Sequence, residues 1–263
     1  MEIIDAHAHI FPQKIAAKAV QSIGAFYDIP MDAPGAAENL LESMKEADVD
    51  RSLVCSVATK PEQVRAINAF LEEQGKLHPE FIPFAAMHPH LADIEEEFAK
   101  MEAAGFYGIK LHPDFQAFDI DDPSAMEMYR LAEGKFPILF HTGDNRYDWS
   151  KPYRLARIME KFPDLVCIAA HFGGYRCWDE AFDVYKGGKL YMDTSSALMF
   201  IDNEKAHRFI DQFGADHFFF GTDFPMWTHK EEIVRFESLG LDEETKKAIY
   251  AENFKRVIIR KEI

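Results

Sequence analysis

Eight short apolar segments rich in β-forming residues recur along this chain, and segments with helical periodicity separate them. The segments expected to be strands run over 3–9, 52–57, 81–87, 107–112, 136–141, 166–171, 190–194 and 218–223. The segments expected to be helices run over 36–47, 61–75, 91–104, 124–133, 152–161, 177–186, 203–213 and 230–238. Because strands that alternate with helices form parallel sheets, eight such units predict a closed (β/α)8 TIM barrel of the α/β class.

The length of the chain fits this prediction as a single domain. Its 263 residues are close to the roughly 250 of an ordinary (β/α)8 barrel. We expect one domain over residues 1–263, with an insertion after the first strand over 11–35 and an extra C-terminal helix or helices from Asp242. A doubly wound open sheet is the rival fold, but the first strand leads into Ile10-Phe11-Pro12 rather than a glycine-rich turn, and neither GxGxxG nor GxxxxGK[ST] occurs.

The net charge and the composition oppose some classes of binding partner. The formal net charge of −16 opposes binding to nucleic acid and to anionic membranes, and no basic patch offsets it. The three cysteines lack paired spacing, and no apolar run approaches the roughly 18 residues of a membrane span. We therefore expect a cytoplasmic protein whose partner is a small-molecule substrate.

Ligating side chains gather where the expected strands end. His7 and His9 form a His-x-His in the first strand, and alternate residues of a strand share one face. The fifth, sixth and eighth strands end at His141, His171 and Asp223. Active sites of (β/α)8 barrels form at these carboxyl ends.

One histidine at a strand end is more often a core residue satisfied by hydrogen bonds than a ligand. Five ligating residues from four strands of one barrel change that balance, because they would converge on one pocket. Neutral imidazoles with a carboxylate suit zinc, manganese or iron. The pattern therefore predicts a metal enzyme.

In the order of these motifs, the chain resembles the amidohydrolase superfamily, in the amidohydrolase-related (amidohydrolase 2) branch with aminocarboxymuconate-semialdehyde decarboxylase and resorcylate-type decarboxylases. The resemblance spans nearly the whole chain. It implies that one divalent ion, most simply zinc, is held by His7, His9, His141 and Asp223, and that His171 acts as the acid or base beside it, with Asp223 taking part in proton transfer. Members of the family are often dimers, so a homodimer is an expectation.

Lys110 leaves the number of metals open. In binuclear members of the superfamily a carboxylated lysine of the fourth strand bridges two metals, whereas the decarboxylase-like branch has one metal. The preferred interpretation is an unmodified Lys110 that binds a substrate carboxylate. A carboxylated Lys110 that bridges two metals and a purely structural Lys110 are the other two interpretations. His112 shares the expected strand face with Lys110 and is a further candidate for contacting substrate or metal.

Weaker candidates lie in the loops after the strands. Arg146 is a candidate for binding an anionic group, and Trp227 for walling the pocket, although surface solvation and aromatic packing explain them equally simply. For Asp144 the two alternatives are the support of a ligand histidine and a cap on the following turn. For Arg176 they are contact with an anion and a charge on the surface. His88 and His90 form a second His-x-His, and Pro89 between them favours a loop with substrate contacts over a second metal site.

Two reactions fit the same residues. Nonoxidative decarboxylation of a small carboxylate, aromatic or unsaturated, is favoured by the single-metal ligand set and the resemblance. Hydrolysis of an amide, lactone or ester is the alternative, and Lys110 favours it. A noncatalytic binding barrel is the remote third, because such a chain is expected to have lost a ligand or His171. A DNase-like barrel is opposed by the net charge.

Overall fold

A computed structural model describes residues 1–31 and 33–259 of the chain. Its contacts divide the chain into two compact units. Unit 1 comprises residues 1–56, 74–82 and 194–263, and unit 2 comprises residues 57–73 and 83–193. The prediction of a single domain stays a prediction.

The strands of unit 1 run parallel around β1. They are β1 (Ile4–His9), β2 (Arg51–Cys55) and β8 (Phe218–Phe219). β1 pairs with β2 from Ile4 opposite Arg51 to His9 opposite Cys55. On its other side, the Ala6 N–H donates to the Phe220 carbonyl at 2.8 Å, and Ala8 forms a parallel bridge with Phe224.

Unit 2 contains a run of parallel strands that pair in chain order. They are β3 (Phe81–Ala86, of which residues 83–86 belong to unit 2), β4 (Gly108–Leu111), β5 (Ile138–Phe140), β6 (Cys167–Ala169) and β7 (Leu190–Asp193). The whole order is β1 to β8 in sequence, and β8 leads back to β1 through the Ala6 bond. This order of strands and helices confirms the predicted (β/α)8 TIM barrel.

Helices occupy the expected places between strands. They are α2 (Ala37–Glu46), α3 (Val64–Leu77), α4 (Ile94–Ala104), α6 (Met126–Ala132), α7 (Pro152–Lys161), α8 (Trp178–Val184), α9 (Asn203–Phe213) and α10 (His229–Glu237). Helices α7 and α9 have the predicted bounds. Pro152 begins α7, and the Asp202 carboxylate caps α9 by accepting from the Lys205 N–H, so both starts were readable from residue type.

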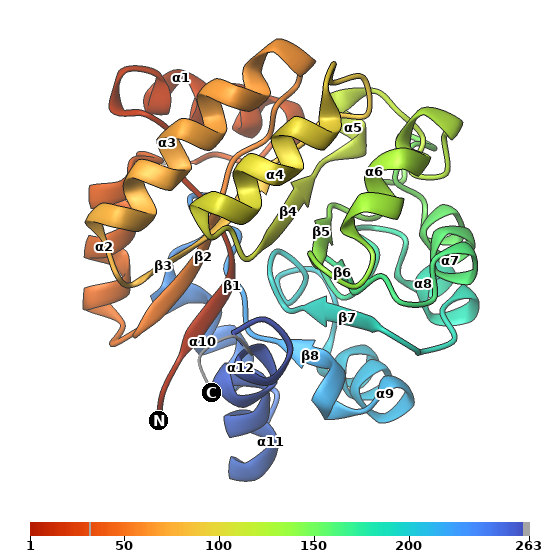
Figure 1. The fold of residues 1–263 in the computed structure, drawn as a ribbon. Coiled ribbons are helices and arrows are strands. Elements are labelled where there is room, and N and C mark those ends of the chain that lie inside the picture. The colour runs from red at the N-terminus through yellow and green to blue at the C-terminus, as the bar shows by residue number, and fades with distance from the viewer. Residues whose placement is uncertain (32, 260–263) are drawn as a thin grey trace. The chain divides into compact units, whose positions relative to one another are not determined.

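Two parts of the chain add helices to this pattern. The expected insertion contains a 15-residue helix, α1 (Gln13–Tyr27), and a short helix, α5 (Pro113–Gln116), follows β4. The C-terminal extension forms α11 (Glu243–Lys247), a π-helical turn over Ala248–Glu252 and α12 (Asn253–Val257). Within this extension Ile249 and Phe254 are fully buried, and α12 contacts β8 (Figure 1). Among the described residues, no helix combines the length and apolarity needed to cross a bilayer.

Every strand except β1 ends earlier than predicted, and this corrects the placement of several candidates. β8 ends at Phe219 and not at Asp223, and β4 ends at Leu111, so His112 is not on a strand face with Lys110. His112 instead caps α5 with its side chain. Strand pairing stops where the backbone turns away from the neighbouring strand. An alternating sequence pattern does not reveal the position of this turn.

Candidate metal centre

Three candidate ligands converge in unit 1. The Nε2 atoms of His7 and His9 are 3.2 Å apart, and they lie 3.6 and 3.4 Å from Oδ1 of Asp223. Ligands about 2.1 Å from a tetrahedral metal are about 3.4 Å from one another, so these separations fit one shared cation. Two neutral imidazoles with a carboxylate are also the donor set that zinc and related ions take.

The other nitrogen of each histidine faces a partner that suits this role. Nδ1 of His7 lies 3.0 Å from the Ser195 hydroxyl, and Nδ1 of His9 lies 3.6 Å from the Cys55 sulfur. A neutral histidine that binds metal through Nε2 carries its proton on Nδ1 and needs an acceptor there. The Ser195 oxygen and the Cys55 sulfur can each accept this proton, so the surroundings are compatible with the metal-binding tautomer of both rings.

Cys55 itself is poorly placed as a ligand. Although His7, His9 and Cys55 lie close enough to hold an ion, the sulfur sits beside Nδ1 of His9, on the side of the ring away from Asp223. Its S–H donates to the Ala8 carbonyl at 3.4 Å. Cys55 thus contacts Nδ1 of His9, the ring nitrogen that does not face Asp223.

A buried carboxylate fixes the backbone that carries these ligands. Oδ1 of Asp5 accepts the N–H groups of His7 at 2.9 Å and Thr222 at 3.0 Å, and Oδ2 accepts the Thr222 hydroxyl at 2.7 Å. Nε2 of His229 lies 3.1 Å from Oδ2 but is not aligned for a hydrogen bond. Asp5 therefore ties the strand of His7 to the segment of Asp223.

In unit 2, His141 and His171 face each other. Nδ1 of His141 lies 3.1 Å from Nε2 of His171, and both side chains are buried. The His171 N–H donates to Oδ1 of Asp193 at 3.0 Å, and the Trp178 indole donates to the His171 carbonyl at 2.9 Å. These bonds hold His171 on both sides of its backbone.

Asp114 is a buried acid beside His141. Its Oδ2 lies 3.5 Å from Nε2 of His141 and 2.6 Å from the Ser150 hydroxyl. Burial raises the pKa of Asp114 to about 7, and the hydrogen bond with Ser150 opposes this rise. Asp114 therefore belongs to the polar surroundings of His141.

His112, Asp114 and His141 lie close enough to hold a cation, but the ring geometry opposes it. The His112 and His141 rings are stacked, 3.9 Å between centroids and 6° between planes. An imidazole binds metal in its own ring plane, and two parallel stacked rings cannot share an ion in both planes. His112 instead lies between the His141 and Phe115 rings, and its Nδ1 accepts from the Phe115 N–H.

The remaining candidates fall in different surroundings. Lys110 is almost completely buried on β4. The Arg146 guanidinium binds the buried Asp144 carboxylate through Nε at 2.9 Å and through a terminal nitrogen at 2.6 Å. Trp227 donates from Nε1 to the Ser196 hydroxyl at 3.1 Å, which links it to the Asp223 side of the site. Their roles toward substrate stay predictions.

His88 and His90 lie in the loop after β3, as Pro89 predicted. The His90 N–H donates to Nδ1 of His88 at 3.2 Å. Burial, with His90 nearby, lowers the pKa of His88. The hydrogen bond between the two histidines thus stabilises the turn in which they lie.

Left-handed backbone marks the ends of several strands. His171, Phe172, Ser196 and Asp223 have φ of 62°, 51°, 49° and 61°. Each such non-glycine residue costs roughly 1 to 2 kcal/mol, and strain of this kind concentrates at functional sites. At these turns the side chains do not follow the alternation of a regular strand, so their directions differ from those that the strand pattern predicts.

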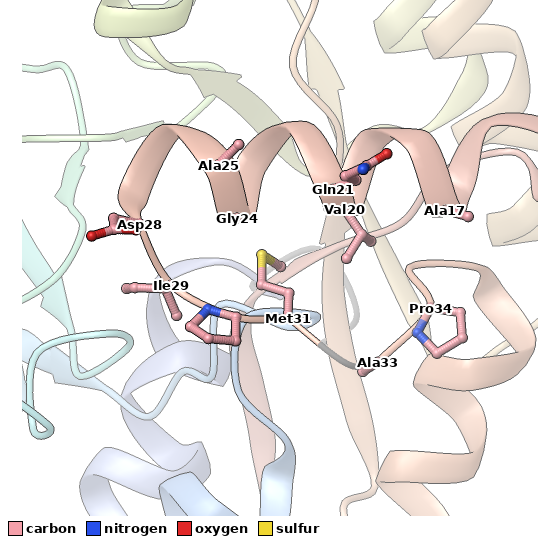
Figure 2. Close-up of a pocket in the computed structure, with 11 residues that line it drawn as sticks. Ala17, Val20, Gln21, Gly24, Ala25, Asp28, Ile29, Met31, Ala33 and Pro34 are labelled. Atoms are coloured by element: carbon pink, nitrogen blue, oxygen red, sulfur yellow. The ribbon is translucent and has the colours of Figure 1, made fainter.

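A separate pocket of about 460 Å³ lies in unit 1 between α1 and the segment after it. Figure 2 shows Val20 and Gly24 of the helix facing Met31 and Pro34. None of the described residues that line it is a metal-ligand candidate. The pocket is therefore distinct from the cluster of His7, His9 and Asp223.

The structure brings the predicted site residues together in two groups. His7, His9 and Asp223 form the group in unit 1, and His141 and His171 form the group in unit 2. That His141 completes the ligand set stays a prediction. Ser195, Ser196, Asp114 and Asp193 were not predicted as site residues. The available signal was a polar residue at or just past a strand end.

Comparison with known proteins now defines the class. The family model described as Amidohydrolase matches residues 4–258, so the chain belongs to the amidohydrolase family. This confirms the resemblance inferred from the motifs. No curated protein matches the chain.

Solved structures share the fold at low identity. An uncharacterized TIM-barrel protein from Bordetella bronchiseptica is 19% identical, with a TM-score of 0.76 and 98% of each chain covered. A dihydroxybenzoic acid decarboxylase from Polaromonas sp., with bound manganese and the inhibitor 2-nitroresorcinol, is 17% identical, with a TM-score of 0.74 over 97% of this chain and 96% of that one. A probable 2-pyrone-4,6-dicarboxylic acid hydrolase from Acinetobacter baumannii is 15% identical, with a TM-score of 0.72 over 98% and 99%.

Proposed function

We propose that this chain is a metal-dependent enzyme that decarboxylates a small carboxylate, aromatic or unsaturated, without oxidation. The observation that carries the proposal is the convergence of two imidazole nitrogens and one carboxylate oxygen within 3.6 Å. The fold shared with a decarboxylase that holds manganese supports the reaction class.

The proposed ligands are His7, His9 and Asp223, with His141 as the fourth. Zinc suits this donor set best, and manganese and iron also fit it. A bound divalent ion would polarise a substrate carboxylate or carbonyl and lower the pKa of a bound water. Lys110, His112, Arg146 and Trp227 are proposed substrate contacts, of which Lys110 is almost completely buried and is proposed to bind an anionic group of the substrate.

His171 is the proposed acid. It delivers a proton to the substrate carbon that bears the carboxylate, forming the C–H bond. The C–C bond to the carboxylate then breaks, its electron pair returns to the substrate, and carbon dioxide leaves. The backbone bonds of His171 to Asp193 and Trp178 hold the acid in place for this transfer.

Hydrolysis of a lactone, amide or ester is the second candidate. The similarity in fold to a probable 2-pyrone-4,6-dicarboxylic acid hydrolase favours it. In that reaction Asp223 would accept a proton from the attacking water, and His171 would stabilise the developing charge. The same residues therefore serve either reaction.

A substrate screen separates the two. Purified enzyme is assayed for carbon dioxide release from small aromatic and unsaturated carboxylates, beside hydrolysis of lactones, amides and esters. We expect carbon dioxide release that His171→Asn lowers by at least about 100-fold while metal content is retained. Turnover of lactones alone would establish hydrolysis instead, and full activity of His171→Asn would remove its proposed role.

A further inference from the structure

Two consecutive serines follow β7, and both are buried. Successive side chains in an extended strand point to opposite faces. The φ of 49° at Ser196 breaks this alternation. As a result both hydroxyls reach the same group of candidate ligands in unit 1, Ser195 at His7 and Ser196 at Asp223.

Each hydroxyl contacts the ligand atom that faces away from the proposed ion. Ser195 Oγ lies 3.0 Å from Nδ1 of His7, whose Nε2 faces Asp223. Ser196 Oγ donates to Oδ2 of Asp223 at 2.7 Å, and Oδ1 of the same carboxylate faces the histidines. Ser195 thereby contacts the ring nitrogen of His7 that lies opposite the proposed ion, and Ser196 fixes the rotation of the Asp223 carboxylate.

The direction of the Ser196 hydroxyl follows from its neighbours. A hydroxyl has one proton, and the Asp223 carboxylate at 2.7 Å is a stronger acceptor than the Met226 sulfur at 3.4 Å. The Trp227 indole donates to the same oxygen at 3.1 Å. The Arg235 guanidinium lies 4.3 Å from the centre of the Trp227 ring, so the donor behind Ser196 is itself held.

We infer that Ser195 and Ser196 are a positioning pair that sets His7 and Asp223 in their metal-binding arrangement. The inference rests on the proposed function, because it requires that these residues bind a divalent ion. Neither serine is assigned a contact with substrate or with the reacting atoms. Their effect is on affinity for the ion and on its coordination.

The test measures metal affinity and folding stability side by side. Affinity for Co²⁺ and Zn²⁺ is obtained by competition with a chelator, the Co²⁺ absorption spectrum reports coordination, and thermal unfolding of the metal-free protein reports stability. The variants are Ser195→Ala, Ser195→Thr and Ser196→Gly. Glycine at residue 196 removes the hydroxyl and also relieves the left-handed backbone, so it separates positioning from folding.

Thr194→Val is the matched control. Thr194 is fully buried one residue earlier, and its hydroxyl bonds only to backbone among the contacts described, accepting from the Gly221 N–H at 3.1 Å and donating to the Gly221 carbonyl at 3.4 Å. This variant is expected to lose stability while its metal affinity stays at the wild-type value.

The positioning pair predicts that Ser195→Ala and Ser196→Gly each weaken metal binding by about 10- to 100-fold and alter the Co²⁺ spectrum. Ser195→Thr restores affinity, and Ser196→Gly keeps or raises stability. Wild-type affinity in Ser195→Ala and Ser196→Gly would overturn the inference and leave the proposed function standing. A wild-type protein that binds no divalent ion would instead overturn the proposed function.

Discussion

At the level of single residues, the buried Asp5 carboxylate connects several segments of unit 1. It receives three hydrogen bonds from His7 and Thr222 and lies 3.1 Å from Nε2 of His229, all out of contact with water. Asp5→Asn removes the charge and places an amide against these donors. We expect a loss of about 3 kcal/mol in the free energy of unfolding, measured in urea. Asp50→Asn is the control, because the exposed Asp50 accepts one N–H, from Ile3, and should cost under about 1 kcal/mol; equal losses would contradict this account.

Glu232 gives a pH-dependent prediction. It is fully buried, and burial raises its pKa to about 8 from the usual 4.5, while the neighbouring Arg235 opposes the rise. Between these values the folded state holds a proton that the unfolded state has released, so this group's contribution to stability is lost as pH rises toward 8. Glu232→Gln, which stays neutral, should remove a slope of up to about 1.4 kcal/mol per pH unit, seen in urea unfolding from pH 5 to 9 with chelator present. Parallel pH profiles for both proteins would show that Glu232 does not titrate in this range.

Part of the candidate site could be predicted from residue type. The other residues of the site depend on backbone turns that the sequence pattern does not show. His7, His9, His141, His171 and Asp223 were found because ligating residues end apolar runs. Ser195, Ser196 and Asp114 were missed, because their roles depend on a left-handed turn and on a short helix after β4. Side chains beyond a strand end have no periodicity from which a direction can be predicted.

At the scale of elements, the turn after β5 depends on a close backbone approach. Gly143 has φ of 85°, and a Cβ there would lie 2.4 Å from the Tyr175 nitrogen. Gly143→Ala should therefore cost about 3 kcal/mol through clash and strain, measured by chemical unfolding. Gly134→Ala is the matched control, since its φ of 73° is similar and the Cβ would meet nothing within 4 Å, so it should cost about 1 kcal/mol. A similar cost at both positions would mean that backbone conformation alone matters.

The elements themselves were largely predictable. Every predicted strand segment overlaps an observed strand, because buried parallel strands read as continuous apolar runs. Helix α1 was not predicted, since the segment was interpreted only as an insertion. The alanines of α1 nevertheless favour a helix, and the prolines after it favour a loop.

At the scale of the whole molecule, the proposed ion should couple binding to stability. An ion present at about 100 times its dissociation constant stabilises the folded chain by about 2.7 kcal/mol. For a chain of this length, a chelator should lower the melting temperature by roughly 5 to 10 °C. Asp223→Asn should show almost no shift, because it lacks one proposed ligand. An equal shift in both proteins would place the ion elsewhere.

We propose that this member of the amidohydrolase family is a one-metal enzyme. Elemental analysis of the purified protein tests it most directly, with Asp223→Asn prepared in parallel. We expect about one divalent ion per chain in the wild-type protein and far less in the variant. Two ions per chain, or none in wild-type protein that has been supplied with zinc and manganese, would contradict it.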